Sequence, residues 1–288
     1  MLREVLQALQ PQAGQTVVDG TLGAAGHSRH IAPRLAPGGT LIGVDRDPMM
    51  LKLARENLAQ TTTEHVHITT HQASYAQLGD LLAAEQRPSV DAIFVDLGLS
   101  SDQLADEQRG FGFRTSAPLD LRFDTTLGQP ASTFLAQADA GQLADVFRQF
   151  GEERFADKIA EQIIRSRRKH PLETTDDLNR CVESAIPSAA ISKKHPATRV
   201  FQALRIYVNQ ELDQLILALD SVFHEALPPG GRLLVLTFHS LEDRLVKDEF
   251  RRQERWKNLT TKPITATPAE TRANPRSRSA KLRVAIRR

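Results

Sequence analysis

Apolar positions in the first hundred residues follow two alternating periodicities. Four short runs rich in β-branched and aliphatic residues predict buried strands: QTVVDG (15–20), GTLIGVDRD (39–47), HVHITTHQA (65–73) and VDAIFVDLG (90–98). Apolar residues at helical spacing lie between these runs, in segments 27–35, 48–58 and 75–85. Strands that alternate with helices pair in parallel through right-handed crossovers. This part of the chain therefore predicts a doubly wound parallel sheet.

The pattern changes over residues 101–197, where no convincing strand is seen. Helical periodicity is found instead in segments 140–150, 152–167 and 176–186, the last preceded by Thr175 as a predicted N-cap. The α/β rhythm then resumes with a long helix at 198–226, a strand in PPGGRLLVLTFHS, a helix at 241–255 and a final strand, LRVAIRR. We expect an α/β core formed by residues 1–100 and 198–288, with residues 101–197 as an inserted helical domain. One large domain is the alternative.

Composition limits the class of protein. Of the 288 residues, 40% are hydrophobic and 25% are charged, which is typical of a soluble globular chain. No apolar run approaches the roughly 18 residues of a membrane span, and MLREVLQALQ resembles an amphipathic helix more than a signal peptide. Cys181 is the single cysteine, so no intramolecular disulfide or sulfur-rich metal site is expected. A cytoplasmic protein fits these features.

Basic residues gather in two clusters, although the net charge is only +2. The C-terminal cluster consists of Arg272, Arg276, Arg278, Lys281, Arg283, Arg287 and Arg288. The second cluster consists of Arg165, Arg167, Arg168 and Lys169. Such clusters are found on proteins that bind polyanions such as nucleic acid, and also on ordinary solvated surfaces. Charge alone leaves both interpretations open.

The first predicted strand runs into a loop with glycines at Gly20, Gly23 and Gly26. In an open parallel sheet, ligands bind at the carboxyl ends of the strands, where such a loop lets a ligand approach the backbone. Dinucleotide sites prefer G-x-G-x-x-G, whereas this loop has G-x-x-G-x-x-G directly after Asp19, whose charge would repel a pyrophosphate. That acid suits the ammonium group of S-adenosyl-L-methionine. A tight turn without a ligand is the remaining alternative.

Three acids end the first, second and fourth predicted strands, namely Asp19, Asp45 and Asp96. This convergence favours a ligand over a plain turn. A metal would require further oxygen or histidine ligands at close spacing, whereas His65 and His67 alternate along a strand and are interpreted as structural. No metal site is expected.

Eight sequence blocks, in order, resemble the bacterial 16S rRNA cytosine-N(4) methyltransferases. The blocks are DGTLGAAGHS, VDRDP, DLGLSSDQL, RGFGFR, PLDLRFD, HPATRVFQALRIYVNQEL, PGGRLLVLTFHSLEDRLVK and NPRSRSAKLRVA. The resemblance implies a Rossmann-like methyltransferase core with an inserted helical domain that recognises the substrate. It also implies methylation, with S-adenosyl-L-methionine, of the exocyclic N(4) amine of a decoding-centre cytidine. The implied partner is 16S rRNA in the small ribosomal subunit, and a homodimer is left open.

The resemblance also implies cofactor contacts. They fall on Ala25, Gly26, His27, Asp45, Tyr75, Asp96 and Gln103. In this scheme the loop N–H groups meet the methionine carboxylate, Asp45 takes the ribose diol and Tyr75 packs on adenine. Asp96 and Gln103 supply polar contacts near the reacting end, and no catalytic residue is assigned.

Two departures from the family pattern stand out. Ala25 replaces a usual glycine, so it must avoid a left-handed conformation or accept strain of roughly 1 kcal/mol. The family also carries a few residues ahead of the first helix, so a start upstream of Met1 is open.

Base recognition is less well defined by the sequence. The stretch DLGLS lacks the Pro-Pro-aromatic turn of many amine methyltransferases, so Asp96 or a carbonyl of residues 97–99 is expected to orient the amine. Candidates for base stacking or phosphate contact are Arg109, Phe111 and Phe113.

Two further features have competing interpretations. Arg205 lies on an apolar helix stripe and is expected either to pair with a buried carboxylate or to contact an RNA phosphate. Ser240 with Asp243 predicts a helix N-cap.

Three functions are alternatives to 16S rRNA methylation: a nicotinamide-dependent oxidoreductase, a non-catalytic RNA-binding assembly factor and a small-molecule methyltransferase.

Overall fold

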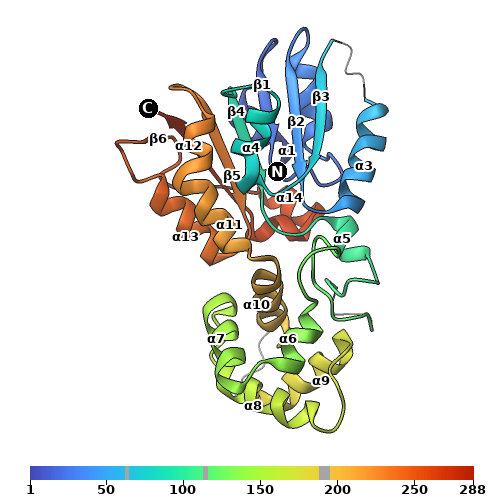
Figure 1. Ribbon diagram of the computed structural model, residues 1–288. Helices are drawn as coiled ribbons and strands as arrows, with labels where there is room; N and C mark the ends of the chain where they lie inside the picture. Colours follow the sequence, from blue (N-terminus) through green and yellow to red (C-terminus); the bar gives the residue numbers. More distant parts are fainter. Residues whose placement is uncertain (62–64, 113–115, 188–194) are drawn as a thin grey trace. The chain divides into compact units, whose positions relative to one another are not determined.

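The computed structural model describes residues 1–61, 65–112, 116–187 and 195–288. The chain forms two compact units (Figure 1). Met1–Gly98 and Leu212–Arg288 form the first, called here the sheet unit, and Leu99–Glu211 form the second, called the helical unit. The helical unit thus continues past residue 197, the end expected for the insertion.

The sheet unit is built on an eight-stranded sheet with the order β3-β2-β1-β4-β5-β8-β6, and β7 also pairs with β8. The strands are β1 (Thr16–Asp19), β2 (Thr40–Asp45), β3 (His67–Gln72), β4 (Ala92–Asp96), β5 (Arg232–Thr237), β6 (Trp256–Asn258), β7 (Ile264–Thr265) and β8 (Lys281–Arg287). The first five pair in parallel, whereas β8 runs antiparallel to β5, β6 and β7. The four strands expected from the first hundred residues are all present.

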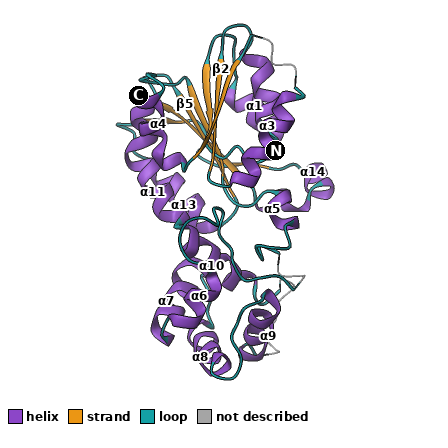
Figure 2. Ribbon diagram, turned by 45° about the vertical axis from the view of Figure 1, so that its right-hand side comes forward, coloured by secondary structure: helices purple, strands orange, loops and turns teal. Residues whose placement is uncertain are grey.

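Both faces of this sheet are covered. Successive residues of β1 point to opposite faces, so Val17 and Val18 belong to two different apolar clusters. The helices of the unit are α1 (Leu2–Leu9), α2 (Ser28–Ile31), α3 (Pro48–Ala59), α4 (Leu78–Ala84), α11 (Glu211–Leu217), α12 (Phe223–Ala226), α13 (Ser240–Glu249) and α14 (Pro268–Ala273). Figure 2 shows helices flanking the strands on either side. The α/β fold with a doubly wound, largely parallel sheet is confirmed.

The helical unit has its own apolar core. Its helices are α5 (Ser101–Ala105), α6 (Ala131–Gln137), α7 (Ala140–Gly151), α8 (Ala156–Arg167), α9 (Thr175–Ala185) and α10 (Thr198–Asn209). Leu143 and Phe147 of α7 and Leu204 of α10 are fully buried in this core. Because α10 fills part of it, the unit extends beyond the boundary expected from sequence. Over the described residues 101–187 and 195–197 no strand forms, apart from one isolated bridge.

The long helix expected at 198–226 is interrupted. Gln210, the residue after α10, adopts a left-handed conformation with φ 51°. The Asn209 side chain accepts a hydrogen bond from the Phe123 N–H and donates to the carbonyl of Leu121, which ties the end of α10 to a neighbouring loop. A second departure from regular helix is the π-helical turn Ala218–Val222.

Several helix ends differ from the sequence-based expectation. The N-cap of α9 is Thr174 rather than Thr175, and its hydroxyl accepts from the Asp177 N–H at 3.2 Å. Helix α13 ends at Glu249, because Trp256 begins a short strand and its indole N–H donates to the buried Glu249 carboxylate at 2.7 Å. No helix among the described residues has both the length and the apolar character to cross a membrane.

Candidate cofactor site

The carboxyl ends of β1, β2 and β4 lie side by side in the sheet, as the register of these parallel strands requires. Each ends in an acid, Asp19, Asp45 or Asp96. The sequence-based expectation that these three carboxylates share one edge of the sheet is therefore met. The edge is the usual ligand-binding position of such folds.

The loop after β1 is held tightly against the sheet. A Cβ atom at Gly20 would lie 3.1 Å from Cβ of Tyr75, so a side chain there would force the loop outward. Gly23 has φ +53° and donates its N–H to Oδ2 of Asp45 at 2.7 Å. Thr21 accepts a hydrogen bond from the Asp96 N–H at 2.6 Å, which joins the loop to the end of β4.

Ala25 takes the strained option that the sequence left open. Its φ is +62°, in the left-handed region that favours glycine, and its methyl group is fully buried. Its N–H donates to the carbonyl of Leu22 at 2.8 Å and its carbonyl accepts from Arg29 at 3.0 Å. An alanine in this left-handed conformation costs roughly 1 kcal/mol more in backbone strain than a glycine would.

The next two residues offer free donors. A Cβ atom at Gly26 would meet nothing within 4 Å. Among the described residues, the N–H groups of Gly26 and His27 have no acceptor. Two such donors beside open space suit a carboxylate, the role expected for this loop.

Asp45 connects the loop to the following helix. Its Oδ2 accepts from Gly23 and its Oδ1 accepts from the Asp47 N–H at 2.9 Å. Burial raises the pKa of Asp45 to about 6, against the lowering effect of backbone hydrogen bonds from Asp47, Gly23 and Arg46. A carboxylate can accept about four hydrogen bonds, so Asp45 keeps an acceptor position for a ribose hydroxyl.

Asp96 is the acid with the least satisfied carboxylate. Its Oδ1 is buried and has no hydrogen-bond partner among the described residues. Its Oδ2 lies 3.5 Å from Nδ1 of His27, whose ring packs edge-on against Phe94. Burial lowers the pKa of His27 to about 4, so the imidazole is neutral at pH 7. A buried, unpaired acceptor indicates a missing donor from a ligand.

All three carboxyl groups hold their protons more tightly than an exposed aspartate does. Burial, followed by the nearby Asp19 and Glu242 charges, raises the pKa of Asp96 to about 7. Burial raises the pKa of Asp19 to about 6, although the Ser28 hydroxyl donates to it at 2.7 Å. Such shifts are typical of functional sites, because the ionised groups are unfavourable for folding.

Asp96→Asn is expected to stabilise the ligand-free protein at pH 8. In the unfolded chain Asp96 ionises near pH 3.8, whereas in the folded protein the pKa is about 7. Ionisation at pH 8 therefore costs folding stability, by about 4 kcal/mol at most at 1.4 kcal/mol per pKa unit. The advantage of the variant should shrink as the pH falls from 7 towards 4, where Asp96 is protonated in the folded wild type.

Denaturant unfolding of wild type and Asp96→Asn between pH 4 and 8 measures this difference. Groups that face Asp96 are Asp19, His27, Glu242 and the amino group of Met1, and all of them are present in both proteins. A stability difference that does not depend on pH would contradict the raised pKa.

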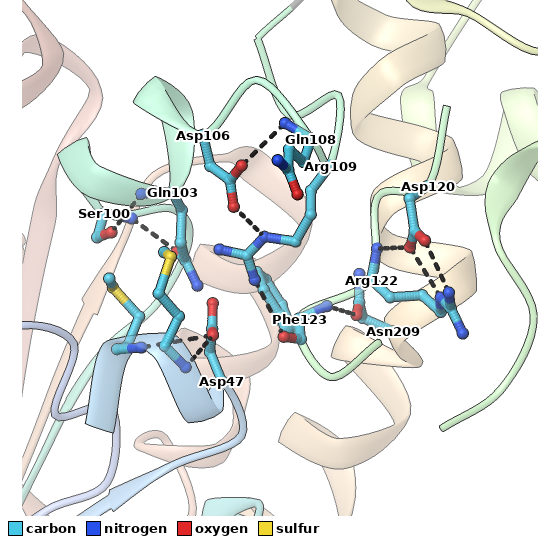
Figure 3. Close-up of polar contacts among 12 residues, drawn as sticks. Asp47, Ser100, Gln103, Asp106, Gln108, Arg109, Asp120, Arg122, Phe123 and Asn209 are labelled. Carbon is cyan, nitrogen blue, oxygen red and sulfur yellow. Dashed lines mark hydrogen bonds and ion pairs between the residues drawn. The ribbon is translucent and has the colours of Figure 1, made fainter. Parts of the chain in front are cut away.

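Tyr75 and Gln103 differ in where they lie. Tyr75 follows β3 in the sheet unit, is 8% exposed and packs with its ring centroid 5.9 Å from that of Phe223. Gln103 belongs to the helical unit, where its Oε1 accepts from the Ser100 N–H at 3.0 Å in a capping box (Figure 3). The sheet unit thus brings together every expected cofactor residue except Gln103. The contacts of both residues with the cofactor stay predictions.

The expected base-stacking residues are placed differently. Phe111 is only 4% exposed, and its ring stacks on Phe123 at 5.6 Å within the core of the helical unit. Arg109 pairs with Asp106 at 2.7 Å and also donates to the carbonyl of Phe123 (Figure 3). Phe113 lies outside the described residues. Phe111 is therefore a packing residue in this structure and presents no open face to a base.

Direct contacts decide between the two interpretations of Arg205 and identify the N-cap of α13. Arg205 makes a two-pronged ion pair with Glu211, at 2.7 and 2.9 Å, as the structural interpretation expected. The N-cap of α13 is His239, paired in a capping box with Glu242, and not Ser240 with Asp243. Asp243 instead pairs with Lys281 and Arg283 of β8. No sequence signal points to His239, because histidine is an uncommon cap.

The donors and acceptors at this edge fit S-adenosylmethionine. Free N–H groups at Gly26 and His27 match its carboxylate, Asp45 matches a ribose diol, and the unpartnered oxygen of Asp96 matches a donor near the reacting end. Among the described residues, no group of three or more His, Cys, Asp or Glu side chains is arranged to hold a metal ion.

Proteins similar to this chain include two curated proteins and one solved structure, and the chain also matches a known family. A Trichlorobacter lovleyi protein named ribosomal RNA small subunit methyltransferase H is 42% identical, over 99% of this chain and 96% of its own. A protein of the same name from Acidobacterium capsulatum is 44% identical, again over 99% of this chain and 96% of its own. The solved structure of a putative rRNA-methylase from Clostridium thermocellum covers 100% of this chain and 95% of its own, with a TM-score of 0.49 and 12% identity. The MraW methylase family matches residues 1–288, and the chain therefore belongs to that family.

Proposed function

We propose that this protein uses S-adenosylmethionine to methylate the exocyclic N(4) amine of a decoding-centre cytidine in 16S rRNA. The observation that carries the proposal is the buried, unpartnered Oδ1 of Asp96 beside a loop with free N–H donors. An acceptor at that place suits the N–H of an amine. The relatives, named small-subunit rRNA methyltransferases at 42–44% identity, support the choice of substrate.

In the proposed reaction, the bound cofactor supplies a methyl group on a positively charged sulfur. The chain's own residues hold and orient the two reactants. Asp96 accepts a hydrogen bond from the amine and so turns its nitrogen lone pair towards the methyl group. Methyl transfer from the cofactor's sulfur to the amine nitrogen would leave the amine with one proton in excess, and the Asp96 carboxylate would accept that proton. A neutral His27 beside Oδ2 leaves that carboxylate free of a competing cation.

Affinity for RNA is expected from exposed arginines of the C-terminal region. Arg272, Arg276 and Arg278 lie on α14 and the turn that follows it, and none of them is buried. Lys281 and the buried Arg283 both form ion pairs with Asp243, at 2.9 and 2.6 Å. The polyanion contact proposed for the tail is assigned to the three arginines because their side chains are exposed.

Replacing Arg272, Arg276 and Arg278 together with alanine should weaken RNA binding about tenfold or more near 0.1 M salt. The slope of log affinity against log salt should become shallower, by roughly 0.7 for each phosphate that is no longer neutralised. Filter binding with a 16S rRNA fragment over a salt series measures both quantities. Lys281→Ala is the matched control and should leave the slope unchanged, because its ammonium is already neutralised by Asp243. Unaltered RNA affinity in the triple variant would argue against this surface.

The helical unit also offers aromatic surface for a base. Tyr207 of α10 is 40% exposed, and its ring centroid lies 4.3 Å from that of Phe134 of α6. Exposed aromatic faces stack on unpaired bases without regard to sequence. This pair supports a substrate-recognition role for the helical unit, and it replaces the buried Phe111 as a stacking candidate.

The proposal is tested with labelled S-adenosylmethionine, offered together with naked 16S rRNA or with 30S subunits from cells that lack the modification. Label on the N(4) of one decoding-centre cytidine is the expected result. RNA binding without transfer would favour the assembly-factor alternative, and preferential binding of a nicotinamide cofactor in equilibrium dialysis would favour the oxidoreductase. The proposal places the enzyme in the cytoplasm, with the small ribosomal subunit.

A further inference from the structure

The turn from β5 into α13 carries a buried histidine–glutamate pair that the reaction described above does not use. His239 is the N-cap of α13, although serine, threonine, aspartate and asparagine are the usual choices. Its Nδ1 accepts from the Glu242 N–H at 3.4 Å, and its Nε2 lies 3.0 Å from Oε1 of Glu242 but forms no hydrogen bond among the described residues. The two side chains are only 11% and 3% exposed.

Glu242 is fixed in place by two backbone N–H groups. Its Oε2 accepts from the N–H of Phe238 at 2.9 Å and from the N–H of His239 at 3.3 Å. A carboxylate with these contacts has one orientation, so its charge has a fixed position. Burying a charge is unfavourable unless hydrogen bonds compensate for the lost hydration, and these contacts do so.

The position of this carboxylate is beside the end of β4. Asp96 pairs in register with Leu236, and the N–H of Leu97 donates to the carbonyl of Leu236 at 2.9 Å. Two residues further on, a Cβ atom at Gly98 would lie 3.4 Å from the ring of Phe238. The backbone that holds Glu242 therefore runs directly alongside Asp96 and the two residues after it. The Glu242 charge acts in turn on Asp96 and raises its pKa.

We propose that Glu242, held by the N–H groups of Phe238 and His239, is a positioning residue for methyl transfer, whose fixed negative charge makes Asp96 a stronger acceptor for the proton that the methylated amine releases. This inference rests on the proposed function. In the step concerned, an N–H bond of the methylated amine breaks and an O–H bond forms on Asp96. Glu242 takes no proton and touches no reacting atom. Its effect is electrostatic, because a second negative charge nearby favours the protonated form of Asp96.

The test compares the pH dependence of single-turnover methyl transfer in wild type and Glu242→Gln, with 30S subunits lacking the modification. Glutamine keeps an oxygen for the Phe238 and His239 N–H groups but removes the charge. The acid limb of the profile should move to lower pH by about half a unit or more, because Asp96 then loses its proton more easily. Asp19, His27 and the Met1 amino group also face Asp96 and are unchanged in the variant.

Two further variants separate charge from structure. Glu242→Asp restores the charge and should return the limb towards the wild-type pH. Asp243→Asn is the matched control, because it removes a charge one residue further on that already pairs with Lys281 and Arg283. This variant should leave the pH of the acid limb unchanged, although the protein becomes less stable. The carbon-13 NMR titration of Asp96 in the ligand-free proteins should show the same order and does not depend on activity.

An acid limb and an Asp96 titration that are the same in wild type and Glu242→Gln would overturn this inference alone. Rate loss at every pH without a shift would do so too, since that is the result of a purely structural role. A wild-type protein that transfers no methyl group to either 30S subunits or naked 16S rRNA would overturn the proposed function, and this inference with it.

Discussion

Replacing Asp96 with asparagine is expected to slow methyl transfer by roughly 100- to 10,000-fold, the range found when a residue that accepts a proton in the reaction is removed. Asparagine has nearly the same shape, so packing against Thr21 and His27 is preserved. Its amide nitrogen is a donor and its oxygen is a weak base. The variant therefore orients the amine poorly and does not take up its proton.

Single-turnover transfer with both substrates saturating measures this effect apart from binding. The matched control is Asp91→Asn, at the opposite end of the same strand, where Oδ2 accepts from the Thr16 N–H at 2.7 Å. That variant loses stability but keeps the active-site acid, so its rate should stay close to that of the wild type. Full turnover in Asp96→Asn would remove Asp96 from the reaction and leave the carbonyls of residues 97–99 to orient the amine.

The second large effect is expected at Asp45, in the binding of S-adenosylmethionine. Asp45→Asn should raise the dissociation constant by roughly 10- to 100-fold, because hydrogen bonds to a charged group contribute about 1.5–3 kcal/mol each. Asparagine also has only one oxygen for the two N–H groups of Gly23 and Asp47 that the carboxylate now accepts. The loop that offers the free N–H donors would therefore lose part of its anchorage.

Isothermal titration with the cofactor alone measures the change without involving RNA. The exposed Asp80→Asn on α4 is a control of equal charge change and should bind as the wild type does. An unaltered dissociation constant in Asp45→Asn would show that binding of the cofactor's ribose does not depend on this acid. It would also weaken the assignment of the carboxyl edge of the sheet as the cofactor site.

Much of the sheet and its acids could be predicted from sequence. The strands at 16–19, 40–45 and 92–96 are almost continuously apolar, because both faces of the sheet are covered. In such strands a terminal aspartate stands out, so Asp19, Asp45 and Asp96 are identifiable. Parallel pairing then requires their carboxyl groups to lie at one edge.

Features that depend on tertiary contacts could not be predicted in the same way. Strands β6 and β7 are short and partly polar, and their pairing with β8 is not visible in periodicity. Phe111 resembles a stacking residue in sequence, but the fold buries it against Phe123. The helix break after Asn209 depends on hydrogen bonds between the Asn209 side chain and a loop that lies 86 to 88 residues earlier in the sequence.

The order of the strands has a consequence for synthesis. Strand β4 lies between β1 and β5, yet β5 and β8 are encoded after the entire helical unit. While the polypeptide emerges from the ribosome, the apolar edge of β4 stays unpaired until Arg232–Thr237 has been made. Chains released early would expose that edge and aggregate. The sheet that carries the cofactor site is thus completed only after its last strands have been made.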